Sequence, residues 1–108
     1  MTEADSIVVV LSTVPDDDRG AALARALVTE ELAACVNLVP GVRSIYRWDG
    51  AVEDGREQLA IIKTRAARVD ALIARLVALH PYQVPEAVVV PVAGGHAPYL
   101  AWAAAAVR

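Results

Sequence analysis

The hydrophobic pattern at the start of the chain changes from a continuous apolar run to helical spacing. Ser6–Thr13 contains the run IVVVL, and an uninterrupted β-branched stretch of this length is typical of a strand covered on both faces. Val14-Pro15 ends the run, and Asp16 follows as the expected N-cap of a helix. From Asp16 to about Ala34 the larger apolar residues recur on one stripe, which predicts an amphipathic helix.

The next stretch has the pattern of a long β-hairpin. Its arms, Cys35–Trp48 and Ala51–Thr64, meet at Asp49-Gly50, a pair that suits a type I′ turn. A second pair, Asp54-Gly55, competes as the turn and would change every cross-strand partner. Each arm would span about 45 Å, and a bare two-stranded ribbon is marginal in water. We therefore expect another copy of the chain to cover part of the hairpin.

The second half of the chain repeats the alternation of strands and helices. Pro40-Gly41 predicts a bulge inside the first hairpin arm. After the hairpin, helical spacing returns over Arg65–Leu79 and ends at His80-Pro81, because the residue before proline avoids the α region. The shorter elements that follow are a loop at Tyr82–Pro85, a strand at Ala87–Val92 that Pro91 places at a sheet edge, and a helix at Pro98–Val107.

The order β-α-β-β-α-β predicts a single α+β domain over residues 1–108. It gives a four-stranded antiparallel sheet with both long helices on one face, and a C-terminal helix is added. The first and last strands are apolar throughout, although two helices cover only one face of a sheet. The short, Ala-rich last helix is small for covering the other face alone. This again favours self-association.

Composition and charge exclude several classes of protein. The chain has 108 residues, is 56% hydrophobic without phenylalanine, and carries a net charge of −3 with scattered basic residues. These properties argue against disorder and nucleic-acid binding, and no apolar run is long enough to span a membrane. The acidic N-terminus lacks the basic region of a signal peptide, and one cysteine fits a reducing compartment. We expect a cytoplasmic location.

Four segments resemble the motifs of one family in order and spacing: LAACVNLVPGVRSIYRWDG, LAIIKT, HPYQVPE and YLAW. The chain is similar to the CutA divalent-cation-tolerance proteins from about Ile7 to Trp102. The resemblance implies a ferredoxin-like domain in a homotrimer like that of the PII signalling proteins, packed through its sheets and hairpins. It also implies a role in tolerance of copper and other divalent cations. It implies no enzymatic reaction and no obligatory cofactor, and copper or another divalent cation is the candidate metal.

Three residues are candidate metal ligands. The Cys35 thiolate is a soft ligand suited to Cu(I), although a lone cysteine at the start of a strand is also a typical small buried residue. His80 offers an imidazole, or its cationic form could interact with the last carbonyls of the preceding helix. Glu86 could add a carboxylate. One cysteine and two histidines cannot close a tetrahedral site, so we expect modest binding at clefts between subunits.

A second group of candidates surrounds the only lysine of the chain, Lys63. A lone cation in an apolar strand needs a carboxylate partner, either Glu57 on the same face of the strand or Glu86 from the last strand. The group predicts either a structural ion pair at a subunit boundary or a polar cleft for a small anion or metal complex. We assign Glu57, Lys63 and Tyr82 to that cleft.

The aromatic residues are expected at the interface between subunits. Tyr46, Trp48 and Trp102 are interface anchors in this interpretation, and the alternative is an aromatic wall for a ligand. No local catalytic constellation is present. Three functions therefore remain open: a non-enzymatic trimer for copper tolerance, a PII-like sensor that binds a small anionic metabolite near Lys63, and a structural trimer that presents a surface to an unknown protein partner.

Overall fold

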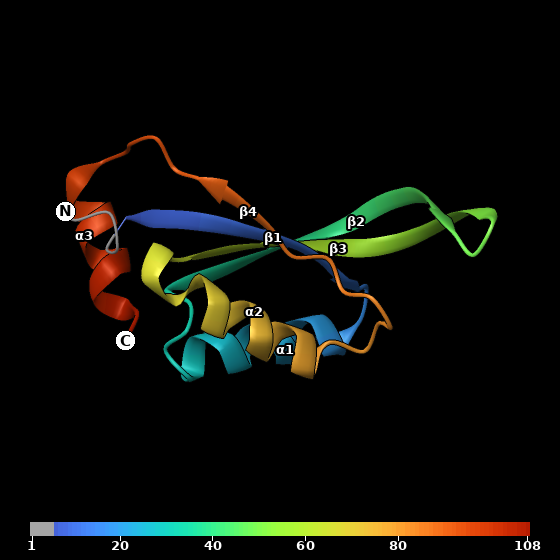
Figure 1. Cartoon of the computed structure of the whole chain (residues 1–108), viewed down its shortest axis with the longest axis horizontal. Coiled ribbons are helices and arrows are strands. Elements are labelled where there is room, and N and C mark those ends of the chain that lie inside the picture. Colours follow the sequence, from blue (N-terminus) through green and yellow to red (C-terminus); the bar gives the residue numbers. More distant parts are fainter. Residues whose placement is uncertain (1–5) are drawn as a thin grey trace.

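The computed structural model describes residues 6–108 as a twisted four-stranded antiparallel sheet with helices α1 and α2 against one face (Figure 1). The strand order is β2-β3-β1-β4. The elements are β1 (Ile7–Pro15), α1 (Asp18–Thr29), β2 (Cys35–Trp48), β3 (Ala51–Arg65), a 3₁₀ turn (Ala66–Arg68), α2 (Val69–Leu79), β4 (Val88–Pro91) and α3 (Ala97–Ala106). The predicted β-α-β-β-α-β order with an added C-terminal helix is confirmed.

Helix α1 begins one residue later than the sequence indicated. The N-cap is Asp17 and not Asp16, because β1 continues through Pro15 and moves the start of the helix along the chain. One carboxylate oxygen of Asp17 accepts a hydrogen bond from the backbone N–H of Arg19 at 2.9 Å. This bond satisfies one of the amide groups that every helix leaves unpaired at its N-terminus.

The same helix ends at Thr29, five residues before the expected end at Ala34. Glu31 has a φ of 60°, which turns the chain back toward the sheet. The backbone N–H groups of Leu32 and Ala33 then both donate to the carbonyl of Leu27, at 3.0 and 3.1 Å. The apolar spacing of the sequence continues past the end of the helix because Leu32, which lies in the turn that follows α1, is also buried.

The hairpin turns at Asp49-Gly50, as predicted. Asp49 has a φ of 50° and Gly50 a φ of 80°, the two positive values that a type I′ turn needs. The competing pair Asp54-Gly55 lies within β3, opposite Ile45 and Ser44. The register shifts by one residue between Val39 and Val42, so the predicted bulge at Pro40-Gly41 is also confirmed.

The main core lies between the sheet and the two long helices. Strand alternation directs every second residue of β1 and β3 toward the helices, which supply leucines from their inner faces. The buried cluster consists of Val10, Val14, Leu23, Leu27, Leu32, Ala33, Ala60, Ile62, Leu72 and Leu76. Buried Thr64 on β3 is satisfied because its hydroxyl donates to the carbonyl of Leu32 at 2.7 Å.

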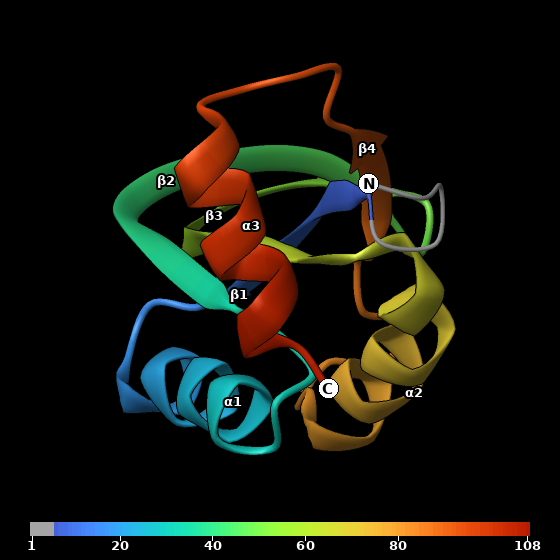
Figure 2. The same ribbon diagram turned by 90° about the vertical axis from the view of Figure 1, so that its left-hand side faces the viewer.

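Helix α3 covers only one end of the opposite sheet face (Figure 2). A second buried cluster forms there from Ile7, Ala34, Ala103 and Val107. Farther along this face large apolar side chains stay exposed in the single chain: Val39, Tyr46, Trp48, Val88 and Val90. The sheet therefore keeps an uncovered apolar face, as the sequence predicted.

The bounds of α2 and β4 also differ slightly from expectation, and α3 spans Ala97–Ala106 where the sequence suggested Pro98–Val107. Helix α2 starts at Val69 because a 3₁₀ turn, Ala66–Arg68, joins it to β3, whereas the sequence suggested a helix from Arg65. Strand β4 is limited to Val88–Pro91 and pairs only with β1, so Pro91 lies on an edge strand as predicted. No helix in the part of the chain that the structure describes is long and apolar enough to cross a membrane.

Candidate functional site

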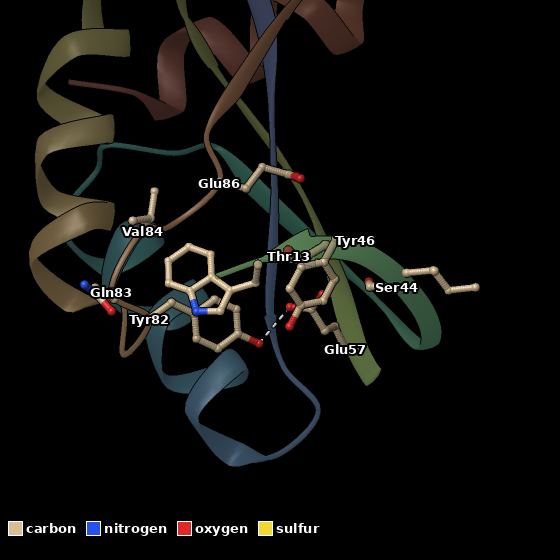
Figure 3. Close-up of a pocket in the computed structure, with 10 residues that line it drawn as sticks. Thr13, Ser44, Tyr46, Glu57, Tyr82, Gln83, Val84 and Glu86 are labelled. Atoms are coloured by element: carbon tan, nitrogen blue, oxygen red, sulfur yellow. Dashed lines mark hydrogen bonds between the residues drawn. The ribbon is translucent and has the colours of Figure 1, made fainter. Parts of the chain in front are cut away.

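An open cavity of about 630 Å³ lies between the outer half of the hairpin and the loop that follows α2 (Figure 3). Three segments that are distant in sequence meet there: the end of β1, the paired strands β2 and β3, and residues 82–86. The lining residues are Thr13, Ser44, Ile45, Tyr46, Trp48, Glu57, Tyr82, Gln83, Val84 and Glu86.

The hairpin register explains why its polar and aromatic side chains share the cavity. Tyr46 pairs with Glu53 and Trp48 with Ala51, while Val42 pairs with Glu57. Because side chains alternate along a strand, Tyr46 and Trp48 lie on the same face of the ribbon as Glu57. The bulge between Val39 and Val42 sets this alternation for the outer half of β2.

His80 holds the loop side of the cavity in place. Its ring is buried, its Nε2 lies 2.9 Å from the carbonyl oxygen of Thr13, and the backbone N–H of Tyr82 donates to its Nδ1 at 3.2 Å. An Nδ1 that accepts a hydrogen bond carries no proton, so Nε2 carries it and donates to Thr13. His80 is therefore a neutral imidazole with both nitrogens engaged.

This arrangement differs from both roles that the sequence suggested for His80. Neither ring nitrogen has a free lone pair for a metal, because one is protonated and the other accepts the Tyr82 amide. The ring also bonds to β1 and to the loop, and not to the last carbonyls of α2. His80 instead positions Tyr82, whose ring centroid lies 4.5 Å from its own.

Tyr82, which His80 positions, binds the first carboxylate of the cavity. Its hydroxyl donates to Oε2 of Glu57 at 2.7 Å (Figure 3). Burial, followed by the hydrogen bond to Glu57, raises the pKa of Tyr82 far above its ordinary value. The phenol of Tyr82 therefore stays protonated, and can donate this hydrogen bond, throughout the physiological pH range.

Glu86 supplies a second carboxylate at the rim. Partial burial raises the pKa of Glu86, and the negative charge of Glu57 raises it further. The two carboxylates therefore repel each other electrostatically across the cavity. Together they make its interior acidic.

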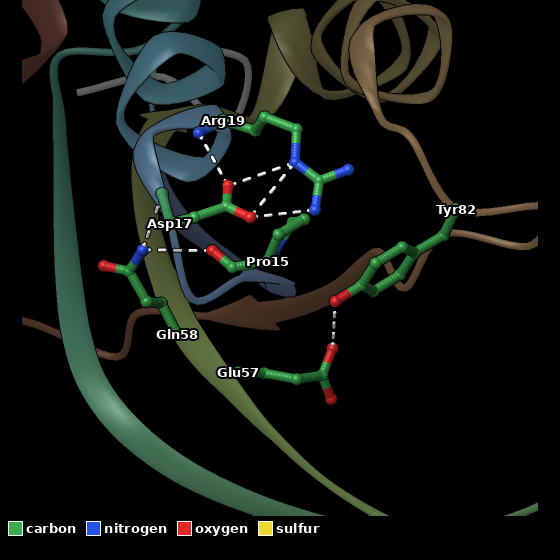
Figure 4. A network of polar contacts seen from close by, with 6 residues as sticks. All are labelled: Pro15, Asp17, Arg19, Glu57, Gln58 and Tyr82. Carbon is green, nitrogen blue, oxygen red and sulfur yellow. Dashed lines mark hydrogen bonds and ion pairs between the residues drawn. The ribbon is translucent and has the colours of Figure 1, made fainter.

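A polar network beside the cavity fixes the corner between β1 and α1 (Figure 4). The side-chain amide of Gln58 donates to the carbonyls of Pro15 and Asp17, at 3.0 and 3.2 Å. The guanidinium of Arg19 pairs with the Asp17 carboxylate at 2.8 Å, and this hydrogen bond lowers the pKa of Asp17. Arg19 is therefore committed to Asp17, although its charge also reaches Tyr82.

Within one chain Lys63 lies away from this cavity, so a single protomer does not bring together the predicted cleft of Glu57, Lys63 and Tyr82. Lys63 pairs with Val9 on β1, whereas Glu57 pairs with Pro15, six positions farther on. The two side chains share a face of β3 as expected, but roughly 20 Å of strand separates them. The ammonium of Lys63 donates to the amide oxygen of Asn37 at 3.0 Å, in place of the carboxylate that the sequence suggested.

The three expected metal ligands do not converge within one chain. Cys35 is half-buried opposite Lys63, with its Sγ 3.6 Å from the amide oxygen of Asn37, whereas Glu86 lies at the cavity. Among residues 6–108 no group of three or more His, Cys, Asp or Glu side chains is placed to hold a metal ion. A closed site built from the described residues would therefore need ligands from more than one protomer.

The aromatic residues separate into two places. Tyr46 and Trp48, expected as interface anchors, line the cavity with Tyr82, so the alternative of an aromatic wall describes their position in the single chain. Trp102 belongs to α3, the helix at the other end of the molecule (Figure 1). It is half-exposed, and its ring centroid lies 5.6 Å from that of Tyr99.

Sequence reasoning missed several lining residues, among them Thr13, Gln83 and Val84. Thr13 lines the cavity because β1 pairs with β3, and its carbonyl oxygen bonds to the imidazole of His80. No local pattern marks this meeting. For Ser44 a signal did exist, since it lies on the same face of the strand as Tyr46 and Trp48.

Comparison with known proteins agrees with the architecture. A family model described as CutA1 divalent ion tolerance protein matches residues 8–106. The divalent-cation tolerance protein CutA of Thermus thermophilus is 51% identical over 94 residues, which are 87% of this chain and 91% of that protein. The crystal structure of CutA from Xylella fastidiosa superposes with a TM-score of 0.92 at 44% identity, covering 95% of this chain and 99% of that one.

A plant relative is longer than this chain. Protein CutA 1, chloroplastic, of Oryza sativa is 47% identical over 95 residues, which are 88% of this chain and 54% of that protein. The chain thus spans about half the length of that relative. Because the family model covers nearly the whole chain and the similarity extends to solved structures over their full length, the chain belongs to the CutA1 divalent ion tolerance protein family.

Proposed function

We propose that this chain acts in divalent-cation tolerance as a non-enzymatic, cytoplasmic homotrimer. The observation that carries the proposal is the apolar sheet face that α3 leaves uncovered, in a chain of the CutA1 family. Monomeric proteins rarely expose large contiguous apolar patches, and those that do usually bind a partner there. The number of three protomers follows from the family resemblance.

The edges of the sheet support assembly as well. The strand order leaves β2 and β4 at the two edges, and β4 is short, apolar and without a second neighbour among the described strands. Exposed edge backbone is a ready template for pairing with another chain. In the proposed trimer, neighbouring copies cover both this edge and the apolar face.

Sedimentation velocity tests the assembly directly. At micromolar concentration we expect one species with three times the 11.4 kDa mass of the chain. A folded species that sediments as a single chain would contradict the proposal, because the apolar face would then be stable in water.

The role of the metal is argued from Cys35. Its thiolate suits Cu(I), and the lack of a closed site within one chain predicts weak binding that neighbouring protomers complete, with Glu86 as a further candidate ligand. Calorimetric titration of Cu(I) under reducing conditions into wild type and Cys35→Ser tests this. We expect the variant to lose the heat of binding. Equal binding by both proteins would remove Cys35 from the site.

The cavity favours a second function, that of a PII-like sensor for a small molecule. A concave site with an aromatic wall and a few fixed polar groups is the usual form of a ligand pocket. A metabolite that binds only the native state raises the melting temperature by mass action, so thermal-shift screening tests this function without a known ligand. Lys63 lies away from the cavity, and this arrangement gives no support to an anionic metabolite there.

A further inference from the structure

The outer half of the hairpin has a second face, opposite the one that lines the cavity, and this face concentrates positive charge. Beyond the bulge, β2 and β3 pair without further irregularity. Tyr46 and Glu57 line the cavity, so the residues that alternate with them lie on the other face. We call it the basic face, and its six exposed residues are Arg43, Ile45, Arg47, Val52, Asp54 and Arg56.

The basic face lies on the helix side of the sheet but beyond the helices. The outer half of the hairpin runs past the ends of α1 and α2 (Figure 1). Gln58, the next residue on the same face of β3, still contacts the start of α1 through the carbonyls of Pro15 and Asp17. The proposed trimer covers the opposite, apolar face of the sheet. Assembly through that face therefore leaves the basic face on the outside.

The charges of the basic face do not balance. The guanidinium of Arg43 binds both carboxylate oxygens of Asp54, at 2.9 and 2.7 Å. This bond lowers the pKa of Asp54, and the charge of Arg56 lowers it further, so one carboxylate already serves two arginines. Arg56 is directly opposite Arg43 in the register, and like charges in such a pair are destabilising. Among the described residues, neither Arg47 nor Arg56 has an ion-pair partner of its own.

Apolar side chains lie between these two arginines. Ile45 pairs with Asp54 and Arg47 with Val52, so Ile45 and Val52 are diagonal neighbours on the basic face. They are 65% and 66% exposed, more than the other large apolar residues of β2 and β3. Arg47 and Arg56 flank them about 13 Å apart along the ribbon, the length of four residues of extended chain. One small anion cannot reach both guanidinium groups, whereas an extended peptide can.

We propose that the basic face binds an acidic segment of a partner protein, in which apolar residues lie between carboxylates. The carboxylates pair with Arg47 and Arg56, whose planar guanidinium groups suit bidentate contact, and the apolar residues cover Ile45 and Val52. Arginine clusters recognise acidic motifs in this way in other proteins. Nucleic acid is the poorer occupant, because the chain has a net charge of −3 and a phosphate backbone gains nothing from the apolar pair.

A designed peptide tests the proposal and needs neither copper nor the cavity. It carries two glutamates on each side of three apolar residues and an uncharged fluorophore, and fluorescence anisotropy follows its binding. Matched peptides carry glutamine or lysine in place of glutamate. We expect saturable binding of the glutamate peptide only, and weaker binding when salt is raised from about 0.05 to about 0.5 M, because salt screens exposed charges. Equal binding of the glutamine peptide, no binding of the glutamate peptide, or tighter binding of a single-stranded oligonucleotide would overturn the proposal.

Charge-removing variants locate the surface. Arg47→Gln and Arg56→Gln are each expected to weaken binding of the glutamate peptide about threefold, and the double variant about tenfold, the range of exposed ion pairs. Arg25→Gln removes the same charge from the exposed side of α1 and should change the affinity less than about twofold. Wild-type affinity in the double variant would overturn the assignment.

Sedimentation velocity of the same samples reports the assembly separately from peptide binding. We expect the double variant to sediment as wild type does. Dissociation of its trimer would show that the basic face is a contact between subunits and would overturn the proposal. A wild-type chain that sediments as a folded monomer, yet binds the glutamate peptide through Arg47 and Arg56, would support this proposal and contradict only the trimer.

Discussion

The imidazole of His80 bonds to the carbonyl of Thr13 at 2.9 Å and so ties the end of α2 to the end of β1, across 67 residues of sequence. The same ring accepts the Tyr82 amide. The loop that carries Tyr82 to Glu57 therefore depends on a neutral histidine, and a structural role accounts for its burial.

Replacing His80 with alanine should lower stability without affecting copper binding. The change leaves the Tyr82 amide and the Thr13 carbonyl without their partner and opens a hole under the loop, so we expect a loss of about 2 kcal/mol in the free energy of unfolding. Urea denaturation measures it, and His96→Ala, an exposed site on the N-terminal side of α3, is the control with no expected effect. A loss of copper affinity in His80→Ala at unchanged stability would instead support a ligand role.

Gly20 should resist substitution by alanine although it lies in a helix. An added Cβ would lie 2.8 Å from Cγ2 of Val14 and 3.0 Å from the carbonyl oxygen of Pro15, so α1 would have to move off β1. Alanine gains about 1 kcal/mol in helix propensity, but overpacking a buried contact costs about 1 to 3 kcal/mol. We expect net destabilisation in a thermal melt. The reverse change at an exposed helical site, Ala22→Gly, calibrates the propensity, and stabilisation by Gly20→Ala would show that the contact yields easily.

Local signals predicted the hairpin well. Asp49-Gly50 determines its own turn, because both residues accept positive φ, and the bulge follows from Pro40-Gly41. The end of α1 could not be predicted in this way. Leu32 continues the apolar spacing of the helix, although it lies in the turn that follows. The left-handed conformation of Glu31 directs Leu32 into the core, and only packing against the sheet makes that conformation favourable.

The candidate site was predictable in its parts and not in its arrangement. Alternation correctly placed Glu57 and Lys63 on one face of β3, but the strand between them is long, and only the register with β1 shows that one belongs to the cavity and the other to Asn37. The roles of the His80 nitrogens depend on contacts with Thr13 and Tyr82, which no spacing rule supplies.

Replacing Glu86 with glutamine should raise the melting temperature at neutral pH and have little effect under acid. The folded-state pKa of Glu86 is raised above its ordinary value of 4.5, so its charged form is disfavoured by folding. That penalty is absent below the unfolded pKa, appears as the pH rises through the interval up to the folded pKa, and is fully present above it. Between pH 4 and 7, the melting temperature of Glu86→Gln should therefore exceed that of wild type by an amount that grows with pH.

Asp17→Asn should change the melting temperature in the opposite direction to Glu86→Gln. The hydrogen bond from Arg19 lowers the folded-state pKa of Asp17 below its ordinary value of 3.8. Its contribution to stability is present above the unfolded pKa and is lost as the pH falls through the folded one. The Asn variant should melt below wild type at pH 7, with the gap closing toward pH 3. A Glu86→Gln effect that is independent of pH would show that the raised pKa does not influence stability.

Val90→Asp should dissociate the proposed trimer while the chain remains folded. Val90 pairs with Val9 on the open sheet face and is 41% exposed in the single chain, so a carboxylate there is tolerated by the protomer. At an interface between copies the same charge would lose its water without gaining a partner, which is strongly unfavourable. Val77→Asp makes the same change on the outer surface of α2, at a residue that is 47% exposed, and should leave the assembly intact. Sedimentation velocity with far-UV circular dichroism separates the outcomes: a folded monomer for Val90→Asp and a trimer for Val77→Asp place the interface on the sheet face, whereas trimers in both variants place it elsewhere.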